Sequence, residues 1–253
     1  MRPAIYLSDR LTVVPPRTIR GPGGSILRLF SSVKQRLVPA GVTPRVIQAG
    51  PFRGLKMELD LHGQTQVYLG LFEREVHPWV TELSRGIHTA IDIGSAHGEY
   101  LLYFLRKTAA QRVLGFEPDE SCWPALQRNL ALNSLSGDAR LSLSNQFISA
   151  QDGDRQISLD SLLPQVGGPC LVKMDVDGLE GRILAGASRF LALAPARWIV
   201  ETHSPELERE VIDIFTEAGY QTRILSQAWW RLFVPEHRPG AQNRWLVATR
   251  SVQ

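Results

Sequence analysis

The sequence predicts an α/β fold in which helices cover both faces of a mostly parallel sheet. An apolar run at residues 90–93 leads through a glycine turn, residues 94–98, into an amphipathic helix that ends near residue 108. A second apolar strand follows at residues 113–117, and strands then alternate with helices along the rest of the chain. Such alternation is typical of parallel sheets with right-handed crossovers.

The segment before this unit predicts an extension to the sheet domain. Residues 1–24 are rich in proline and glycine, which favours an arm with little regular structure. Helical spacing of apolar residues predicts a helix over 25–38. Alternating apolar and polar residues predict a hairpin from 45–50 and 55–61, which residues 66–81 extend before entering a short helix. We expect residues 1–66 to form a lid or oligomer contact, and residues 67–253 to form the main domain.

The elements after the second strand follow from the same patterns. They are a helix over 119–133, a strand over 139–149, a short helical segment over 157–163, a strand and loop over 169–179, a helix over 180–193, a strand over 197–203, a helix over 205–218, and strands at 221–225 and 244–250. Residues 226–242 are too irregular to assign. Their aromatic pair, Trp229 and Trp230, belongs either to the core or to a lid over a substrate.

Composition narrows the class of protein. The 253 residues are 43% hydrophobic and 21% charged, which is enough for a substantial core and ordinary for a soluble domain. The sequence has no apolar run of the ~18 residues that a membrane helix needs, and the first residues lack a signal-peptide core. We therefore expect a cytoplasmic protein. Cys122 and Cys170 are expected to be thiols rather than a disulfide or metal site.

Charge is distributed unevenly along the chain. Residues 1–56 contain ten Lys/Arg and a single acid, Asp9, whereas the remainder contains 18 basic and 24 acidic residues. We expect the basic arm to lie on its own acidic body. An anionic substrate, an acidic carrier protein, a nucleic acid and a second subunit remain alternative partners.

The glycine turn predicts a ligand site. Gly94 allows the backbone to approach a ligand closely, and the N–H groups that begin the next helix favour an anionic group. Glu117, about 23 residues further on, has the position of an acid that accepts hydrogen bonds from ribose hydroxyls. The turn reads D-x-G-x-x-x-G and lacks the middle glycine of G-x-G-x-x-G, which argues against a nucleotide-binding dehydrogenase. A non-catalytic ligand-binding module remains a further alternative.

Six segments together resemble the FkbM family of S-adenosylmethionine-dependent methyltransferases. They are residues 92–98, 115–120, 129–133, 159–163, 172–180 and 199–203, in the family's order and spacing. The block KMDVDGLE, from Lys173 to Glu180, is similar to the family signature K-I-D-V-E-G-A-E and is the most specific match. The resemblance covers about residues 68–225. The chain departs from the family with Ser95 and Ala96 in place of Ala-Asn, and with Asp177 in place of Glu.

The resemblance implies a Rossmann-like, seven-stranded sheet with strand order 3-2-1-4-5-7-6, and a ligand crevice between strands one and four. It also implies S-adenosylmethionine as cofactor, with the ammonium near Asp92 and the ribose diol at Glu117. The residues expected to contact the cofactor are Asp92, Gly94, Ser95, His97, Gly98, Glu117, Pro118, Asn145, Gln146 and Asp175.

We expect transfer to a hydroxyl of a small molecule, such as a sugar or secondary metabolite, by direct displacement with a general base. The catalytic candidates are Asp175, Glu201, His203, Lys173 and Glu180, with Asp177 beside them. Lys173 and Asp175 share a strand face, and a lysine in a central strand needs carboxylate partners. In the main interpretation an acid and His203 act as the base.

Alternatives to this chemistry remain open. In one of them Asp175, Glu201 and His203 bind Mg²⁺ or Mn²⁺, which acidifies the hydroxyl directly. Another is N-methylation of an amine, a peptide or RNA. Against adenine or glutamine methylation, the fourth strand lacks [D/N]-P-P-[Y/F].

Overall fold

The computed structural model describes residues 38, 40–227, 231 and 244–250. The predicted arm, nearly all of the predicted helix over 25–38, and the pair Trp229–Trp230 lie outside these residues. Within the described ranges, no helix combines the length and the apolar character required to cross a membrane.

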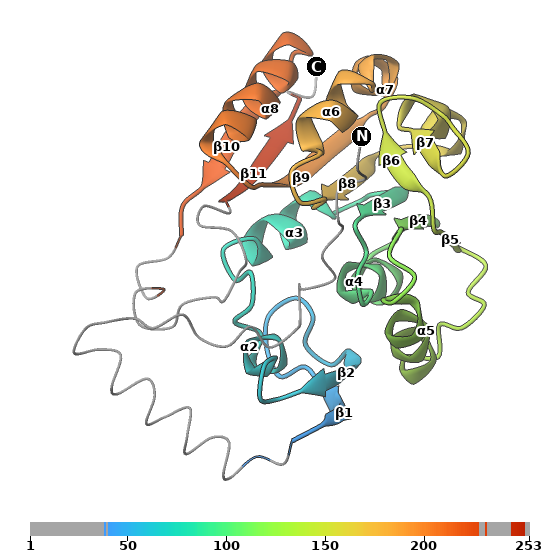
Figure 1. Ribbon diagram of the computed structural model, residues 1–253, viewed down its shortest axis with the longest axis vertical. Coiled ribbons are helices and arrows are strands. Elements are labelled where there is room, and N and C mark those ends of the chain that lie inside the picture. Colours follow the sequence, from blue (N-terminus) through green and yellow to red (C-terminus); the bar gives the residue numbers. More distant parts are fainter. Residues whose placement is uncertain (1–37, 39, 228–230, 232–243, 251–253) are drawn as a thin grey trace.

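A seven-stranded sheet forms the centre of the molecule (Figure 1). Its strands are β3 (Thr89–Ile93), β4 (Arg112–Phe116), β5 (Leu141–Ser144), β8 (Cys170–Met174), β9 (Ala196–Thr202), β10 (Gln221–Leu225) and β11 (Arg244–Thr249). They lie side by side in the order β10-β11-β9-β8-β3-β4-β5. Counted along the chain and starting from β5, this order is 3-2-1-4-5-7-6. Within this sheet β11 runs opposite to the other six strands, which are parallel to one another. The order reverses between β3 and β8, so these strands end at the edge where such sheets bind ligands.

Helices cover both faces of the sheet (Figure 1). One face packs against α3 (His77–Leu83), α4 (Glu99–Lys107) and α5 (Trp123–Leu132), and the other against α6 (Glu180–Ala185), α7 (Ser188–Leu193) and α8 (Pro205–Glu217). Successive side chains of β3 point to opposite faces of the sheet. Ala90 therefore packs in the hydrophobic cluster on the first face, whereas Ile91 and Ile93 pack in the cluster on the second. Each face of the sheet is therefore buried, as a mostly parallel sheet requires.

The predicted hairpin is present as β1 (Val42–Val46) and β2 (Lys56–Asp60), which pair antiparallel. Met57 and Leu59 of β2 are buried in the same core cluster as α4 and α5. Asn129 of α5 and Asn133, the residue that caps this helix, bind the backbone edge of β2: Asn129 Oδ1 accepts from the Glu58 N–H at 2.8 Å, and Asn133 Oδ1 accepts from the Lys56 N–H at 3.0 Å. The hairpin is therefore part of the core on this side of the sheet.

The prediction that residues 66–81 extend the hairpin is wrong. They form α2 (Thr65–Leu69), a turn and α3. Gly70 ends α2 in the left-handed conformation with φ 66°. A Cβ on Gly70 would lie 2.3 Å from the Ala49 carbonyl oxygen, so only glycine allows the chain to turn so close to the hairpin.

Three further elements differ from the sequence prediction. The strand expected over 139–149 is divided: β5 ends at Ser144, and β6 (Phe147–Ser149) pairs in a separate sheet with β7 (Gln156–Ser158). The segment over 157–163 begins in β7 and continues as a 3-10 helix, η1 (Asp160–Gln165). The helix expected over 180–193 is interrupted at Gly186, where the Ala150 backbone occupies the space of a Cβ. These breaks depend on contacts distant in sequence, which local periodicity does not contain.

Candidate functional site

The glycine turn lies between β3 and α4 and is fastened to the neighbouring strand. Gly94 and Gly98 have φ of 78° and 88°, a region that favours glycine. The N–H groups of Gly94 and Ser95 donate to the Phe116 carbonyl of β4 at 2.9 and 3.1 Å. These two N–H groups hold the turn in place. Donors for an anionic ligand are expected instead at the start of α4, because the first N–H groups of a helix have no partner within it.

Glu117 closes the turn from the end of β4. Its Oε2 accepts from the Ala96 N–H at 2.7 Å, and its Oε1 accepts from the Asp119 N–H at 2.8 Å. The residue is 5% exposed. A carboxylate oxygen can accept more than one hydrogen bond, so this arrangement positions Glu117 without preventing it from accepting hydroxyls. The predicted ribose partner is thus held beside the glycine turn.

Lys173 joins the turn to the next strand. It lies opposite Asp92 in the pairing of β3 with β8, and its Nζ lies 3.5 Å from Asp92 Oδ1 and 3.7 Å from Asp175 Oδ2. The same ammonium donates to the Gly94 carbonyl at 2.9 Å. The expected pairing of this buried lysine with carboxylates is therefore observed. Burial raises the pKa of Asp92 to about 6, even though Lys173 acts to lower it.

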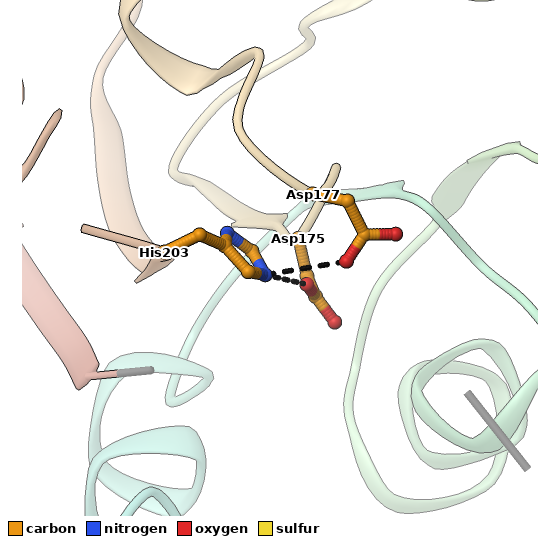
Figure 2. Close-up of side chains that lie close together, drawn as sticks. All are labelled: Asp175, Asp177 and His203. Atoms are coloured by element: carbon orange, nitrogen blue, oxygen red, sulfur yellow. Dashed lines mark ion pairs between the residues drawn. The ribbon is translucent and has the colours of Figure 1, made fainter. Parts of the chain in front are cut away.

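The ends of β8 and β9 bring four carboxylates around His203. Its Nε2 lies 3.3 Å from Asp177 Oδ1 and 3.7 Å from both Asp175 Oδ1 and Glu201 Oε2, while its Nδ1 lies 2.9 Å from Glu180 Oε1. Figure 2 shows the imidazole directed at the two aspartates. Burial acts to lower the pKa of His203, but Asp177 and Glu180 together outweigh this effect. The pKa is therefore raised from 6.5 to about 9. His203 is therefore an imidazolium at neutral pH.

This charge state bears on the predicted pair of an acid and His203. An imidazolium has no lone pair with which to accept a proton, so the raised pKa favours the acid of the pair as the base near neutral pH. Glu180 is held by several contacts. It is fully buried, pairs with His203, and accepts from the Val176 and Gly178 N–H groups at 3.4 and 3.3 Å. These contacts join Glu180 to the loop after β8 and to His203.

Two acids that the sequence analysis did not select complete the site. Glu73 has φ 50°, is 6% exposed, and accepts from the Tyr100 hydroxyl at 2.7 Å. Its carboxylate lies within 4.8 Å of those of Asp175 and Glu201. Burial, and next the charge of Glu73, raise the pKa of Glu99 to about 8. Glu73 lies in a loop without periodicity, so no local pattern distinguishes it from a solvated acid.

The other residues predicted to contact the cofactor lie around the turn and differ in their exposure. Pro118 is buried, whereas Asn145 is exposed and Gln146 is half-buried. The carbonyl of His97 accepts from Asn129 Nδ2 at 2.9 Å, and burial lowers the pKa of its imidazole. These positions surround the turn and the end of β5, consistent with a ligand that extends from one to the other.

Two groups of side chains in the described part of the chain could hold a metal ion. They are Asp175, Asp177 and His203, and Glu73, Asp175 and Glu201. The predicted set of Asp175, Glu201 and His203 overlaps both groups and equals neither. A metal on His203 would have to displace the proton that the carboxylates stabilise.

No family model matches this sequence, and no curated protein matches it either. Solved structures do resemble it. The methyltransferase FkbM from Methylobacillus flagellatus KT is 19% identical with a TM-score of 0.52; the match covers 64% of this chain and 43% of that one. An S-adenosylmethionine-dependent O-methyltransferase from Thermotoga maritima is 14% identical over 72% of this chain and 66% of its own, with a TM-score of 0.47. A precorrin-6Y C5,15-methyltransferase from Geobacter metallireducens GS-15 is 13% identical over 70% and 87%, with a TM-score of 0.48.

The first of these similarities identifies the fold. The seven-stranded, mostly parallel sheet with its reversal between β3 and β8 is a Rossmann-like fold, which this chain shares with that methyltransferase. The aligned region is less than half of the FkbM structure's length.

Proposed function

We propose that the protein is an S-adenosylmethionine-dependent methyltransferase that methylates a hydroxyl of a small molecule. One observation carries the proposal. Lys173 Nζ contacts the Gly94 carbonyl, Asp92 and Asp175 together, so the turn expected to bind the cofactor and the acids expected to act on the acceptor share one sheet edge. Strand ends at a switch point are the usual location of such sites.

The residues of the turn fit this cofactor. Asp92 is fully buried with the Lys173 ammonium 3.5 Å from its Oδ1, and a carboxylate can accept several hydrogen bonds, which suits the ammonium of a methionyl group as a further partner. The start of α4 suits its carboxylate. Glu117, held at the end of β4, suits the ribose diol. The pattern also excludes the close pyrophosphate approach of a dinucleotide, because Ala96 stands where a middle glycine would be needed.

In the proposed reaction, bound S-adenosylmethionine supplies an electrophilic methyl group on a sulfonium. The chain's own task is to orient the acceptor and to take its proton. We assign the removal of the acceptor's proton to the carboxylate of Asp175. This residue directly follows the last residue of β8. The His203 imidazolium, 3.7 Å from Asp175 Oδ1, orients this carboxylate and is a positioning residue.

A second candidate, N-methylation of an amine, is favoured by one feature of the site. Glu73, Asp175 and Glu201 lie within 4.8 Å of one another, and such a group of carboxylates attracts a cationic acceptor. A protonated amine must lose a proton before it attacks, so the same base would serve.

Titration calorimetry with S-adenosylmethionine, S-adenosylhomocysteine and NAD tests the cofactor assignment. We expect binding of both S-adenosyl compounds and none of NAD. Binding of NAD alone would assign the fold to another class of enzyme. Single-turnover assays with and without EDTA then test the metal alternative: activity that is lost on chelation and restored by Mg²⁺ would transfer proton removal from Asp175 to a metal-bound hydroxyl.

A further inference from the structure

Two buried asparagines at α5 have no part in the proposed chemistry. Asn129 is 1% exposed, and Asn133, which caps the helix, is 7% exposed. Residues four apart lie on the same side of a helix, so the two amides are neighbours. Asparagine is a weaker helix former than alanine or leucine, and a buried amide is stable only when its polar atoms have partners. The partners of these two amides therefore indicate what the residues do.

Both amides bind β2, but they differ in their second partner. Asn133 binds both backbone groups of Lys56: its Oδ1 accepts from the N–H at 3.0 Å, and its Nδ2 donates to the carbonyl at 2.7 Å. Asn129 Oδ1 accepts from the Glu58 N–H at 2.8 Å, and its Nδ2 donates to the His97 carbonyl at 2.9 Å. Of the two residues, Asn129 is the one that connects β2 with the glycine turn.

The bond to His97 fixes the end of the turn that adjoins α4. The first part of the turn is bound through the N–H groups of residues 94–96, by the Phe116 carbonyl and by Glu117. The His97 carbonyl belongs to the peptide plane between His97 and Gly98, so Asn129 sets the orientation of that plane. The helix begins directly after Gly98, and its first N–H groups are the proposed donors to the cofactor's carboxylate.

We propose that Asn129 is a positioning residue that couples the cofactor turn to the hairpin of β1 and β2. The inference rests on the proposed function and deepens it, because it makes the hairpin a supporting part of the cofactor site. One end of the Asn129 amide holds the His97 carbonyl and the other holds the Glu58 N–H. The turn is thus held in one conformation before the cofactor binds, which reduces the cost of ordering it on binding.

The hairpin has further contacts that do not depend on either amide. Met57 and Leu59 are buried in the core cluster of α4 and α5. The Phe52 ring, between the two strands, packs edge-to-face against Tyr100 and Tyr103 of α4, with centroid distances of 5.3 and 5.6 Å. These contacts remain when one asparagine is replaced, so we expect each single variant to fold with its hairpin in place.

The test compares Asn129→Ala with Asn133→Ala, which is the matched control. Each variant removes an amide that binds β2, so both should unfold at a lower urea concentration than the wild-type protein. The first also removes the bond to His97, whereas the second leaves it intact. We expect the affinity for S-adenosylhomocysteine, measured by calorimetry, to fall about 10-fold in Asn129→Ala and to stay within about 2-fold of the wild-type value in Asn133→Ala.

A second measurement uses the wild-type protein and follows amide hydrogen exchange by NMR. Coupling between two sites is reciprocal, so bound S-adenosylhomocysteine should strengthen the contact of Asn129 with β2. We expect it to slow exchange of the Glu58 N–H more than that of the Asp60 N–H. The latter donates at 2.8 Å to Gln64 Oε1, four residues further along the chain, and serves as the internal control.

The outcomes separate the inference from the proposed function. An equal loss of affinity in the two variants would overturn the inference, because the asparagines would then act only on the stability of the fold. Unchanged affinity in Asn129→Ala would also overturn it. If that variant does not fold, the wild-type protein still decides, since equal slowing of exchange at Glu58 and Asp60 contradicts the coupling. If the wild-type protein does not bind S-adenosylhomocysteine, the proposed function itself fails.

Discussion

The two halves of the candidate site are built in opposite ways. On the cofactor side, backbone hydrogen bonds fix the turn after β3. Two of its three positive φ angles fall on Gly94 and Gly98, and the third falls on Ala96, whose N–H donates to Glu117. On the acceptor side, the positive φ angles fall on Glu73 and Asp177, whose side chains approach other acids. Non-glycine residues in this conformation persist only when their surroundings hold them. The contrast is between a turn closed by backbone hydrogen bonds and a charge-dense group of acids, which in the proposed function bind the cofactor and move a proton.

The largest expected effect is on the cofactor side. Gly94→Asp places a side chain at φ 78° and a negative charge beside the carboxylate-binding start of α4. We expect S-adenosylhomocysteine affinity to fall by more than about 100-fold, measured by calorimetry. Gly137→Asp, at φ 72° with open space around it, is the matched control and should bind normally. Retained affinity in folded Gly94→Asp would remove the turn from the site.

The next effect concerns stability on the acceptor side. The pKa of His203 is raised from 6.5 to about 9, so its stabilising contribution is fully present below pH 6.5 and is lost as the pH rises through about 9. The contribution amounts to about 3 kcal/mol at most. We expect His203→Gln to lower the free energy of unfolding at pH 6 and to flatten its decline toward pH 9, as followed by urea denaturation. His88→Gln controls for the loss of a histidine elsewhere. A wild-type profile that rises over this range would contradict the assigned charge state.

A smaller effect is expected at Glu117. Glu117→Ala removes the acceptor of two backbone N–H groups and of the proposed ribose contact, so affinity for S-adenosylhomocysteine should weaken by about 1–3 kcal/mol. Comparing the loss for the whole cofactor with that for adenosine distinguishes the two contributions. If Glu117→Ala weakens neither ligand, the carboxylate serves only to close the turn.

The same contrast between the two halves explains which parts of the candidate site could be predicted from the sequence. The turn and its acid are local features: a strand, a glycine turn and a helix adjoin along the chain, and Glu117 ends the next strand. The pairing of Lys173 with Asp175 also follows from strand alternation, whereas its contact with Asp92 depends on the register of β3 with β8. These parts of the site were therefore predictable from spacing.

The acceptor side was not predictable in the same way. Glu73 comes from a loop before the sheet, and its position depends on Tyr100 and on the contact of Arg231 with Glu75. The pKa of His203 is raised, against the effect of burial, by Asp177, Glu180 and Asp175, which lie around it only in the folded chain. Gly186 and Gly70 interrupt elements because of neighbouring backbone that is distant in sequence. Such effects arise only when the chain is folded.

The central claim is that one half of the site binds the cofactor and the other removes the proton of the acceptor. It is tested most directly by two measurements on Asp175→Asn: cofactor affinity by calorimetry, and single-turnover methyl transfer to a hydroxyl substrate that the wild-type protein accepts. We expect affinity within about 3-fold of the wild-type value and a chemical step slowed at least about 100-fold, as for a lost general base. EDTA should not change the wild-type rate. Full single-turnover activity in Asp175→Asn would contradict the account, because proton removal would then not depend on the carboxylate at the end of β8.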